Sequence, residues 1–207
     1  MKVLVLTTDA FGGHGGIALY TRNMLTALCA HSSRPKVIAI PRVAPFPAEP
    51  LPEGLTWDTS SLGGKANYFG AVARAALRSF DLVICTHIHL LPLAYAIHKL
   101  RGAPLILFIY GLEVWKPTTK PLANRLVSKL DAFVSIRTRT TSMFRAWAKL
   151  DGVAEYKLEN AIDLARYGVA PKSDGSVRTD CAGSSPATRQ AVSTMSLIAW
   201  PSPDAQT

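Results

Sequence analysis

The sequence starts with KVLVLT at residues 2–7, FGGHGG at residues 11–16 and IALYTRNMLTALC at residues 17–29. The first of these segments is apolar on both faces, which is typical of a strand buried in a parallel sheet. The third has apolar residues at helical spacing, and we expect a helix over residues 16–31. A strand, a glycine-rich loop and a helix in this order predict the start of a βαβ fold.

The same alternation continues along most of the chain. Apolar runs predict further strands at residues 37–40, 81–86, 104–109, 132–136 and 156–158. Helical spacing predicts helices at residues 66–80, 91–100, 120–130 and 140–150. The proline-rich residues 41–54 are expected to form a loop. The sequence therefore predicts the α/β class, with a Rossmann-like parallel sheet that carries helices on both faces.

Glycines surround a histidine between the first strand and the first helix, in the order Gly12, Gly13, His14, Gly15 and Gly16. Residues 13–18 match the spacing of the dinucleotide fingerprint GxGxxA, but that fingerprint also needs an acid after the second strand. Here the second strand leads into Pro41 and Arg42, and the Gly-Lys-Ser/Thr of a P-loop is missing. Two interpretations remain: a tight turn that needs glycine, or an anion site formed by bare amides at a helix N-terminus.

The composition limits the partners and the compartment. The 207 residues include 23 Lys and Arg against 14 Asp and Glu, a formal net charge of +9, which favours anionic partners such as nucleotide phosphates or acidic lipid headgroups. The three cysteines lack metal-binding spacing, and Cys29 and Cys85 are expected to be small core residues in a reducing compartment. Because the sequence has no export signal and no apolar stretch of about 18 residues, a cytoplasmic location is expected.

Residues 116–149 are strongly basic, with Asp131 as their one acid. The basic residues are Lys116, Lys120, Arg125, Lys129, Arg137, Arg139, Arg145 and Lys149. They form either two solvated helix faces or a surface that docks on anionic lipid, where each is worth about 1 kcal/mol. Because no nucleic-acid-binding motif accompanies the charge, nucleic acid is not an expected partner.

Five segments together resemble the N-terminal domain of family 4 retaining glycosyltransferases, which have the GT-B fold. They are residues 12–22, 81–92, 102–115, 133–135 and 159–167. The first is similar to the family's GG(x)GG-aliphatic loop, the second to its D-strand-H-x-H segment and the third to its strand-H-G-x-E-x-W segment. The fourth is similar to a strand that ends in Val-Ser, and the fifth to P-N-G-V/I-D-x-x-x-F. The resemblance covers residues 1–171, which are expected to form one domain.

The resemblance implies a donor that is a nucleotide diphosphate sugar, transfer with retention, and a glycan or lipid-linked acceptor. It implies neither a cofactor nor a bound metal ion. In the family, the N-terminal domain mainly holds the acceptor, and its glycine loop lies near the donor diphosphate. In this chain, that loop consists of Gly12, Gly13, Gly15 and Gly16. An enzyme of this kind works in the cytoplasm, often at the inner face of the cytoplasmic membrane.

Polar residues that follow the predicted strands are the candidates for contacts with the acceptor, because ligands of such sheets bind beyond the carboxyl ends of the strands. They are His14, His87, Tyr110, Glu113 and Arg137. Tyr110 and Glu113 are also the candidates for a catalytic role. Tyr110 stands where many family members have a histidine, and a phenol can donate a hydrogen bond but cannot act as a base near neutral pH. Glu113 either binds acceptor hydroxyls or caps the next helix.

Other aromatic and histidine side chains have competing interpretations. His87 and His89 are two residues apart at a predicted strand end, so we expect their side chains on opposite faces and not on one metal ion. Either can also be a packed histidine at a strand end. His14 is expected to be exposed, as a ligand-binding residue or as a spacer. Trp115 is either a wall for sugar stacking or a core aromatic residue.

Residues 172–207 differ from the rest, because they are rich in Ser, Thr, Ala and Pro and have neither helical nor strand periodicity. This composition predicts a disordered tail, or translation in a shifted reading frame where the family continues into a donor-binding domain. We therefore expect a truncated glycosyltransferase that is inactive as an isolated chain. The competing hypotheses are a non-catalytic glycan-binding module, a subunit completed by a separate donor-domain chain, and an NAD-dependent dehydrogenase.

Overall fold

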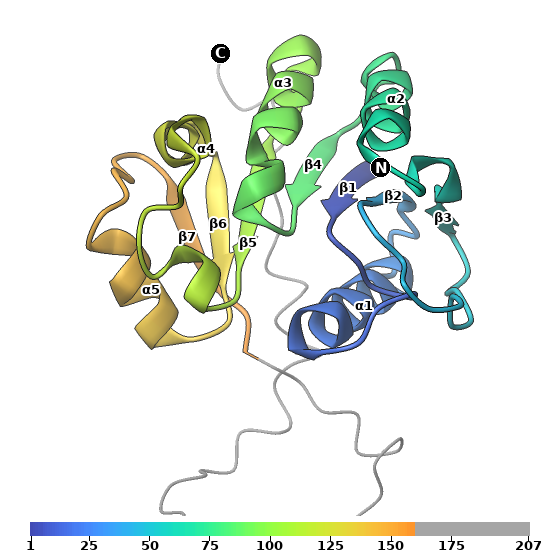
Figure 1. The fold of residues 1–207 in the computed structure, drawn as a ribbon, viewed down its shortest axis with the longest axis horizontal. Helices are drawn as coiled ribbons and strands as arrows, with labels where there is room; N and C mark the ends of the chain where they lie inside the picture. Colours follow the sequence, from blue (N-terminus) through green and yellow to red (C-terminus); the bar gives the residue numbers. More distant parts are fainter. Residues whose placement is uncertain (160–207) are drawn as a thin grey trace, which may run out of the picture. The chain divides into compact units, whose positions relative to one another are not determined.

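Seven parallel strands form a single sheet in the computed structural model, which describes residues 1–159. The strand order is β3-β2-β1-β4-β5-β6-β7 (Figure 1). The strands are β1 (Lys2–Thr7), β2 (Lys36–Pro41), β3 (Leu55–Trp57), β4 (Leu82–Cys85), β5 (Leu105–Ile109), β6 (Ala132–Ser135) and β7 (Ala154–Lys157). Residues 1–157 form one compact unit. The predicted α/β class and parallel sheet are confirmed.

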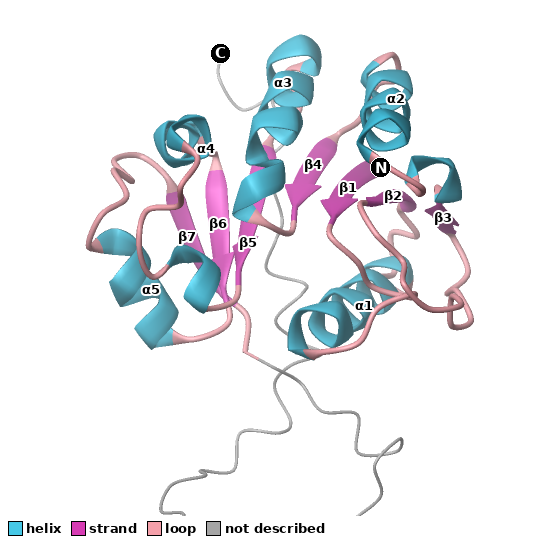
Figure 2. Ribbon diagram, viewed as in Figure 1, coloured by secondary structure: helices cyan, strands magenta, loops and turns pink. Residues whose placement is uncertain are grey.

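Helices connect most of these strands (Figure 2). They are α1 (Gly16–Cys29), α2 (Lys65–Ala76), α3 (Leu91–Arg101), α4 (Pro121–Leu126) and α5 (Thr138–Arg145). In Figure 1, α1 lies on one face of the sheet, and α2 and α3 lie on the other. This arrangement confirms the expected helices on both faces.

The strand sequences explain why both faces are covered. Leu4 and Leu6 of β1 belong to the apolar cluster that includes residues of α2 and α3, whereas Val3 and Val5 point to the opposite face. All four side chains are 0% exposed. A strand buried on both faces is stable only between two helical layers, so the apolar run of β1 determines this part of the architecture.

The structure differs from the sequence-based prediction at several element ends. Strand β3 was not expected, because its three residues follow Pro52 and only Trp57 is buried. The helix expected over residues 120–130 is α4 followed by the 3-10 helix η4 (Val127–Lys129). The helices expected over residues 66–80 and 140–150 end earlier, at Ala76 and Arg145. Apolar spacing extends past these ends because the residues after a helix also pack on the core.

The proline-rich residues 41–54 form a loop, as predicted, and this loop is hydrogen-bonded to the segment that follows β1. The amide of Phe46 donates to the carbonyl of Gly12 at 3.0 Å, and the amide of Glu49 donates to that of Phe11 at 2.7 Å. The Arg42 amide also donates to the carbonyl of Thr7 at 2.8 Å. The loop is therefore docked along the glycine-rich segment.

Some predictions concern residues outside those described. They are the domain boundary at residue 171, the character of residues 172–207, Cys181, and all but the first residue of the motif at 159–167. Of the two cysteines within residues 1–159, Cys85 is buried as expected, whereas Cys29 is half-buried. None of the described helices combines the length and the apolar character needed to span a bilayer.

Candidate functional site

The candidate site lies where the strand order of the sheet reverses. Strands β1 and β4 are neighbours, but the chain leaves β1 toward β2 and leaves β4 toward β5, on the opposite side. The crossover helices α1 and α3 therefore lie on opposite faces (Figure 1). Ligands of open α/β sheets bind beyond the carboxyl ends of the strands at such a point. Here these ends lead into residues 8–16 and 86–90.

Two of the four glycines after β1 are required for packing. A Cβ atom at Gly12 would lie 2.7 Å from the Cβ of Ala44 and 2.8 Å from the carbonyl oxygen of Phe46. A Cβ atom at Gly13 would overlap the Asp9 carboxylate. Both glycines are buried. They allow the loop to lie against residues 44–46 and Asp9, so their side-chain-free backbone does not face solvent.

The other two glycines are exposed at the start of α1. Gly15 precedes the helix with φ 104°, a conformation that favours glycine, and Gly16 is its first residue. A Cβ atom at either position would contact nothing within 4 Å. The helix has no side-chain N-cap and no acidic residue in its first turn. The first amides of α1 are thus open to an anion, and the positive end of the helix dipole favours one.

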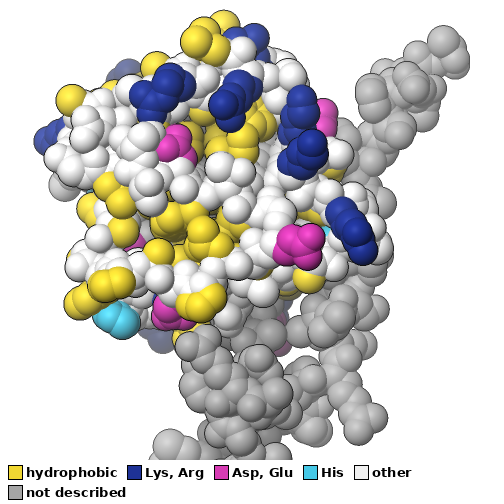
Figure 3. Space-filling view, turned by 90° about the vertical axis from the view of Figure 1, so that its right-hand side faces the viewer, with side chains coloured by type: hydrophobic (Ala, Val, Ile, Leu, Met, Phe, Trp, Pro, Cys, Tyr) yellow, Lys and Arg dark blue, Asp and Glu magenta, His cyan; other side chains and the backbone are white. Residues whose placement is uncertain are grey.

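His14 is exposed beside these amides, as expected, and its ring lies against the ring of Phe46. The two ring centroids are 4.1 Å apart. Phe46 is 48% exposed, and Val43 and Leu51 of the same loop are also exposed. Figure 3, which views the molecule from the side on which β3 lies, shows apolar side chains gathered at the centre of the view. The proline-rich loop therefore places an apolar surface next to the glycines.

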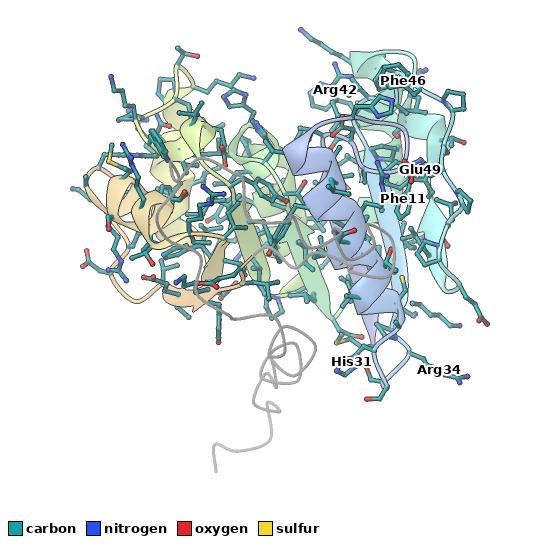
Figure 4. All side chains as sticks on the ribbon, turned by 90° about the horizontal axis from the view of Figure 1, so that it is seen from below. Phe11, His31, Arg34, Arg42, Phe46 and Glu49 are labelled. Carbon is teal, nitrogen blue, oxygen red and sulfur yellow. The ribbon has the colours of Figure 1, made fainter. Side chains whose placement is uncertain are left out.

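Arg22 connects the glycine loop to the proline-rich loop. It is only 8% exposed, although it is charged. Its guanidinium donates to the carbonyl of Ala10 at 3.1 Å, to that of Gly13 at 3.0 Å, and to the carboxylate of Glu49. Figure 4 shows Phe11, Phe46 and Glu49 beside the N-terminal half of α1.

No sequence pattern identified Arg22 or Glu49 as site residues. The available signal was that Arg22 falls on the buried stripe of α1, four residues after Ala18 and three before Leu25. A charged residue at such a position needs buried partners. The identity of the partner could not be read from the sequence, because Glu49 belongs to a loop without periodicity.

Tyr110 follows β5 and points into the protein. Its hydroxyl lies 3.1 Å from that of Thr21 on α1, and its ring is 5.4 Å from the ring of Tyr20. The residue is 7% exposed, and burial raises the pKa of its phenol well above the ordinary value. The hydroxyl therefore joins β5 to α1 and stays protonated. Contact between Tyr110 and an acceptor stays a prediction. It requires the Tyr110 hydroxyl to leave the hydroxyl of Thr21.

Glu113 stabilises the turn after β5. Its carboxylate accepts hydrogen bonds from the amide of Tyr110 and, at 2.9 and 3.0 Å, from the amide of Gly111. The 3-10 helix η3 (Leu112–Val114) starts at this turn. These hydrogen bonds lie within the turn, and neither η3 nor α4 has a side-chain cap, so they represent neither of the two roles left open for Glu113. Its contact with acceptor hydroxyls stays a prediction.

The expectation that His87 and His89 point to opposite faces of a strand is wrong. Strand β4 already ends at Cys85, and the 3-10 helix η2 (Ile88–Leu90) follows. His87 caps η2, with its Nδ1 accepting from the amide of His89 at 3.2 Å, and the two ring centroids are 4.9 Å apart. Within residues 1–159, no group of three or more His, Cys, Asp or Glu side chains is placed to hold a metal ion.

The positive charge of Lys120 acts on both histidines. Burial lowers the pKa of His87 most, and the neighbouring His89 and Lys120 lower it further, against an opposing effect of Glu113. Burial and Lys120 also lower the pKa of His89. The loop after β5 thus lies near the loop after β4, as their adjacent positions in the sheet require.

Two arginines follow β6 at the same edge. The side chain of Arg137 is exposed just before α5. The guanidinium of Arg139 lies over the ring of Trp115, 4.9 Å from its centroid. Trp147 donates its indole N–H to the carbonyl of Val114 at 2.7 Å. These contacts hold α5 against the turn that contains η3. Arg137 and Trp115 therefore belong to adjoining loops. Trp115 is half-buried, with the Arg139 guanidinium over its ring.

Solved structures share this fold. The chain matches HepE from Anabaena in complex with UDP (17% identity, TM-score 0.52) and with UDP and glucose (15% identity, TM-score 0.53), in each case over 83% of this chain and 47% of that chain. It also matches the lipopolysaccharide outer core galactosyltransferase WaaB in its apo form (15% identity, TM-score 0.51), over 79% of this chain and 47% of that chain. No protein-family model and no curated protein matches the chain. It spans about half the length of these solved structures and has their α/β fold over the matched part.

Proposed function

We propose that this chain provides the acceptor-side half of a nucleotide-sugar-dependent glycosyltransferase with the GT-B fold. The observation that carries the proposal is the open N-terminus of α1 at Gly15 and Gly16, placed where the strand order reverses. The shared fold supports it, because HepE was solved with UDP and with UDP-glucose, and WaaB is a galactosyltransferase. The resemblance of the loop and strand-end segments to family 4 supports the retaining class.

In the proposed mechanism, the amides of Gly15 and Gly16 donate to the diphosphate of the donor. Negative charge grows on that group as the bond to the sugar breaks. Donors that are fixed in place before the reaction stabilise this charge without reorganisation. The mechanism needs no cofactor beyond the nucleotide diphosphate sugar, which is a co-substrate. Gly12 and Gly13 contribute by allowing the loop to pack, not by facing the donor.

The acceptor is proposed to be a glycan or a lipid-linked glycan bound at the same edge of the sheet. His14, His87 and Arg137 are the proposed contacts, since they follow β1, β4 and β6; His14 and Arg137 are exposed, and His87 is half-buried. Tyr110 and Glu113 are proposed to hold the turn after β5 in place beneath the acceptor. The nucleoside and sugar of the donor are proposed to bind to a donor-binding domain of the kind that the family resemblance implies.

A peripheral contact with the inner face of the cytoplasmic membrane is proposed for the basic region at residues 116–149. Its lysines and arginines have exposed side chains, Leu122 within it is 58% exposed, and Leu112 shortly before it is 79% exposed. Such a surface suits anionic headgroups, at about 1 kcal/mol per basic residue. Co-sedimentation with vesicles that contain acidic lipid is expected to exceed that with neutral vesicles. Equal co-sedimentation with both would contradict this part of the proposal.

A subunit that a separate donor-domain chain completes is the second candidate. Transfer of radiolabel from UDP-glucose and UDP-galactose into an extract of glycans and lipids distinguishes the two candidates. The purified chain is expected to show little or no transfer by itself. Transfer that appears when a donor-domain chain is added identifies a subunit, and turnover by the isolated chain contradicts the expected inactivity.

A further inference from the structure

Arg22 holds the residues directly before the open end of α1. Its two carbonyl partners, Ala10 and Gly13, bracket the tight part of the glycine loop. Gly15 follows two residues later, and its carbonyl already accepts from the amide of Leu19 in the first turn of α1, at 3.0 Å. The direction of the first amides of α1 is therefore fixed from both sides, by the helix and by the guanidinium.

Glu49 extends this connection to the proline-rich loop. Its carboxylate pairs with Arg22, and its amide donates to the carbonyl of Phe11 at 2.7 Å. The neighbouring Phe46 amide donates to Gly12 at 3.0 Å. A largely buried guanidinium is stable only when its charge is paired. The Nη1 and Nη2 groups of Arg22 have partners, whereas its buried Nε has none within residues 1–159. Arg22, the glycine loop and residues 46–49 therefore form one hydrogen-bonded unit.

We propose that Arg22 and Glu49 are positioning residues for the anion site at Gly15 and Gly16. In this account, the proline-rich loop is part of that site although it does not touch the ligand. Loss of the ion pair lets residues 10–14 move, and the amides then lose their common direction. The proposal rests on the proposed function, because that function supplies the anion.

The substitution Glu49→Gln separates positioning from simple electrostatics. It removes a negative charge near the site, so electrostatics alone predicts tighter binding of an anion. Positioning predicts the opposite, because the glutamine cannot form the ion pair that holds Arg22. The measurement is a titration of ¹⁵N-labelled full chain with inorganic diphosphate, followed at the amide signals of Gly15 and Gly16. We expect an affinity about tenfold lower than that of the unmodified chain.

Two substitutions of the arginine complete the test. Arg22→Lys keeps the charge but cannot reach two carbonyls and a carboxylate with one ammonium group, so it is expected to restore little of the affinity that Arg22→Met loses. Arg78→Met is the matched control, because Arg78 is exposed and lies just before β4, at the opposite edge of the sheet. Amide hydrogen exchange is expected to increase in residues 10–14 for Glu49→Gln and not for Arg78→Met.

The outcomes distinguish this inference from the proposed function. If the unmodified chain does not bind diphosphate at Gly15 and Gly16, the site itself is wrong and both proposals fail. If it binds, and a folded Glu49→Gln variant binds equally well or more tightly, only the positioning role is overturned. The same conclusion follows if Arg22→Lys binds like the unmodified chain. Should Arg22→Met fail to fold, Glu49→Gln and Arg22→Lys still decide the question.

Discussion

The hydroxyl of Tyr110 lies 3.1 Å from the hydroxyl of Thr21, in the buried space between β5 and α1. Tyr110→Phe is expected to lower the free energy of unfolding by about 1 kcal/mol, because it leaves the Thr21 hydroxyl buried without this partner. Denaturant unfolding of Tyr110→Phe, Thr21→Val and the double variant measures the coupling. If the changes in the free energy of unfolding of the two single variants simply add in the double variant, the hydrogen bond is contradicted.

Glu113 is expected to contribute to stability because its carboxylate holds the amides of Tyr110 and Gly111. Glu113→Gln keeps one carbonyl acceptor but loses the charge, so we expect a loss of about 1 kcal/mol in the free energy of unfolding. Glu53→Gln, at an exposed position, is the matched control and is expected to change little. Unchanged stability of Glu113→Gln would favour the acceptor-binding role instead.

The proximity of Lys120 to the two histidines predicts a shift that NMR can measure. Lys120→Gln removes a positive charge and is expected to raise the pKa of His87 and His89 toward the ordinary value. Lys36→Gln, at the start of β2 and the other edge of the sheet, is expected to leave both unchanged. Titration of the imidazole signals measures both pKa values. If Lys120→Gln and Lys36→Gln change them equally, the loop after β5 does not lie near the loop after β4.

The lowered pKa of His87 also predicts how stability depends on pH. The unfolded chain binds a proton near pH 6.5, whereas the folded protein binds it at a lower pH. The unfolded state therefore binds more protons between these two values, and stability falls as the pH drops below about 6.5. Thermal unfolding between pH 5 and 8 measures this slope, and His87→Gln is expected to reduce it. An unchanged slope in that variant would contradict the prediction.

The two described cysteines are expected to differ in reactivity. Burial raises the pKa of the Cys85 thiol to about 12, and the backbone of His87 offsets this only in part. Cys29 is half-buried and is expected to react first with a thiol reagent. In a Cys181→Ser background, one thiol is expected to react in the native protein and a second only on unfolding. Two thiols reacting at one rate would show that β4 is accessible.

The fold could be predicted because its strands carry the signal within their own sequences. The apolar run of β1 is buried on both faces, and only a two-sided helical cover satisfies it. Strand β3 carries no such signal, because its pairing with β2 depends on the path of the proline-rich loop.

The candidate site was predictable in position but not in detail. Gly12 is confined by Ala44 and Phe46, which lie about 30 residues away in the sequence, and Gly13 is confined by the Asp9 carboxylate. The Arg22–Glu49 pair joins residues 27 positions apart, and no local pattern indicates it. For Glu113, the residue type was identified, but the direction of its side chain follows from its hydrogen bonds to the amides of the turn after β5.

The central claim is that the amides of Gly15 and Gly16 bind the diphosphate of a nucleotide sugar. The most direct measurement is a pair of titrations of the ¹⁵N-labelled full chain, one with UDP and one with uridine at the same concentrations. We expect UDP to shift the amide signals of Gly15 and Gly16 and uridine to leave them in place. The anion site is wrong if UDP leaves both signals unmoved or if uridine moves them equally.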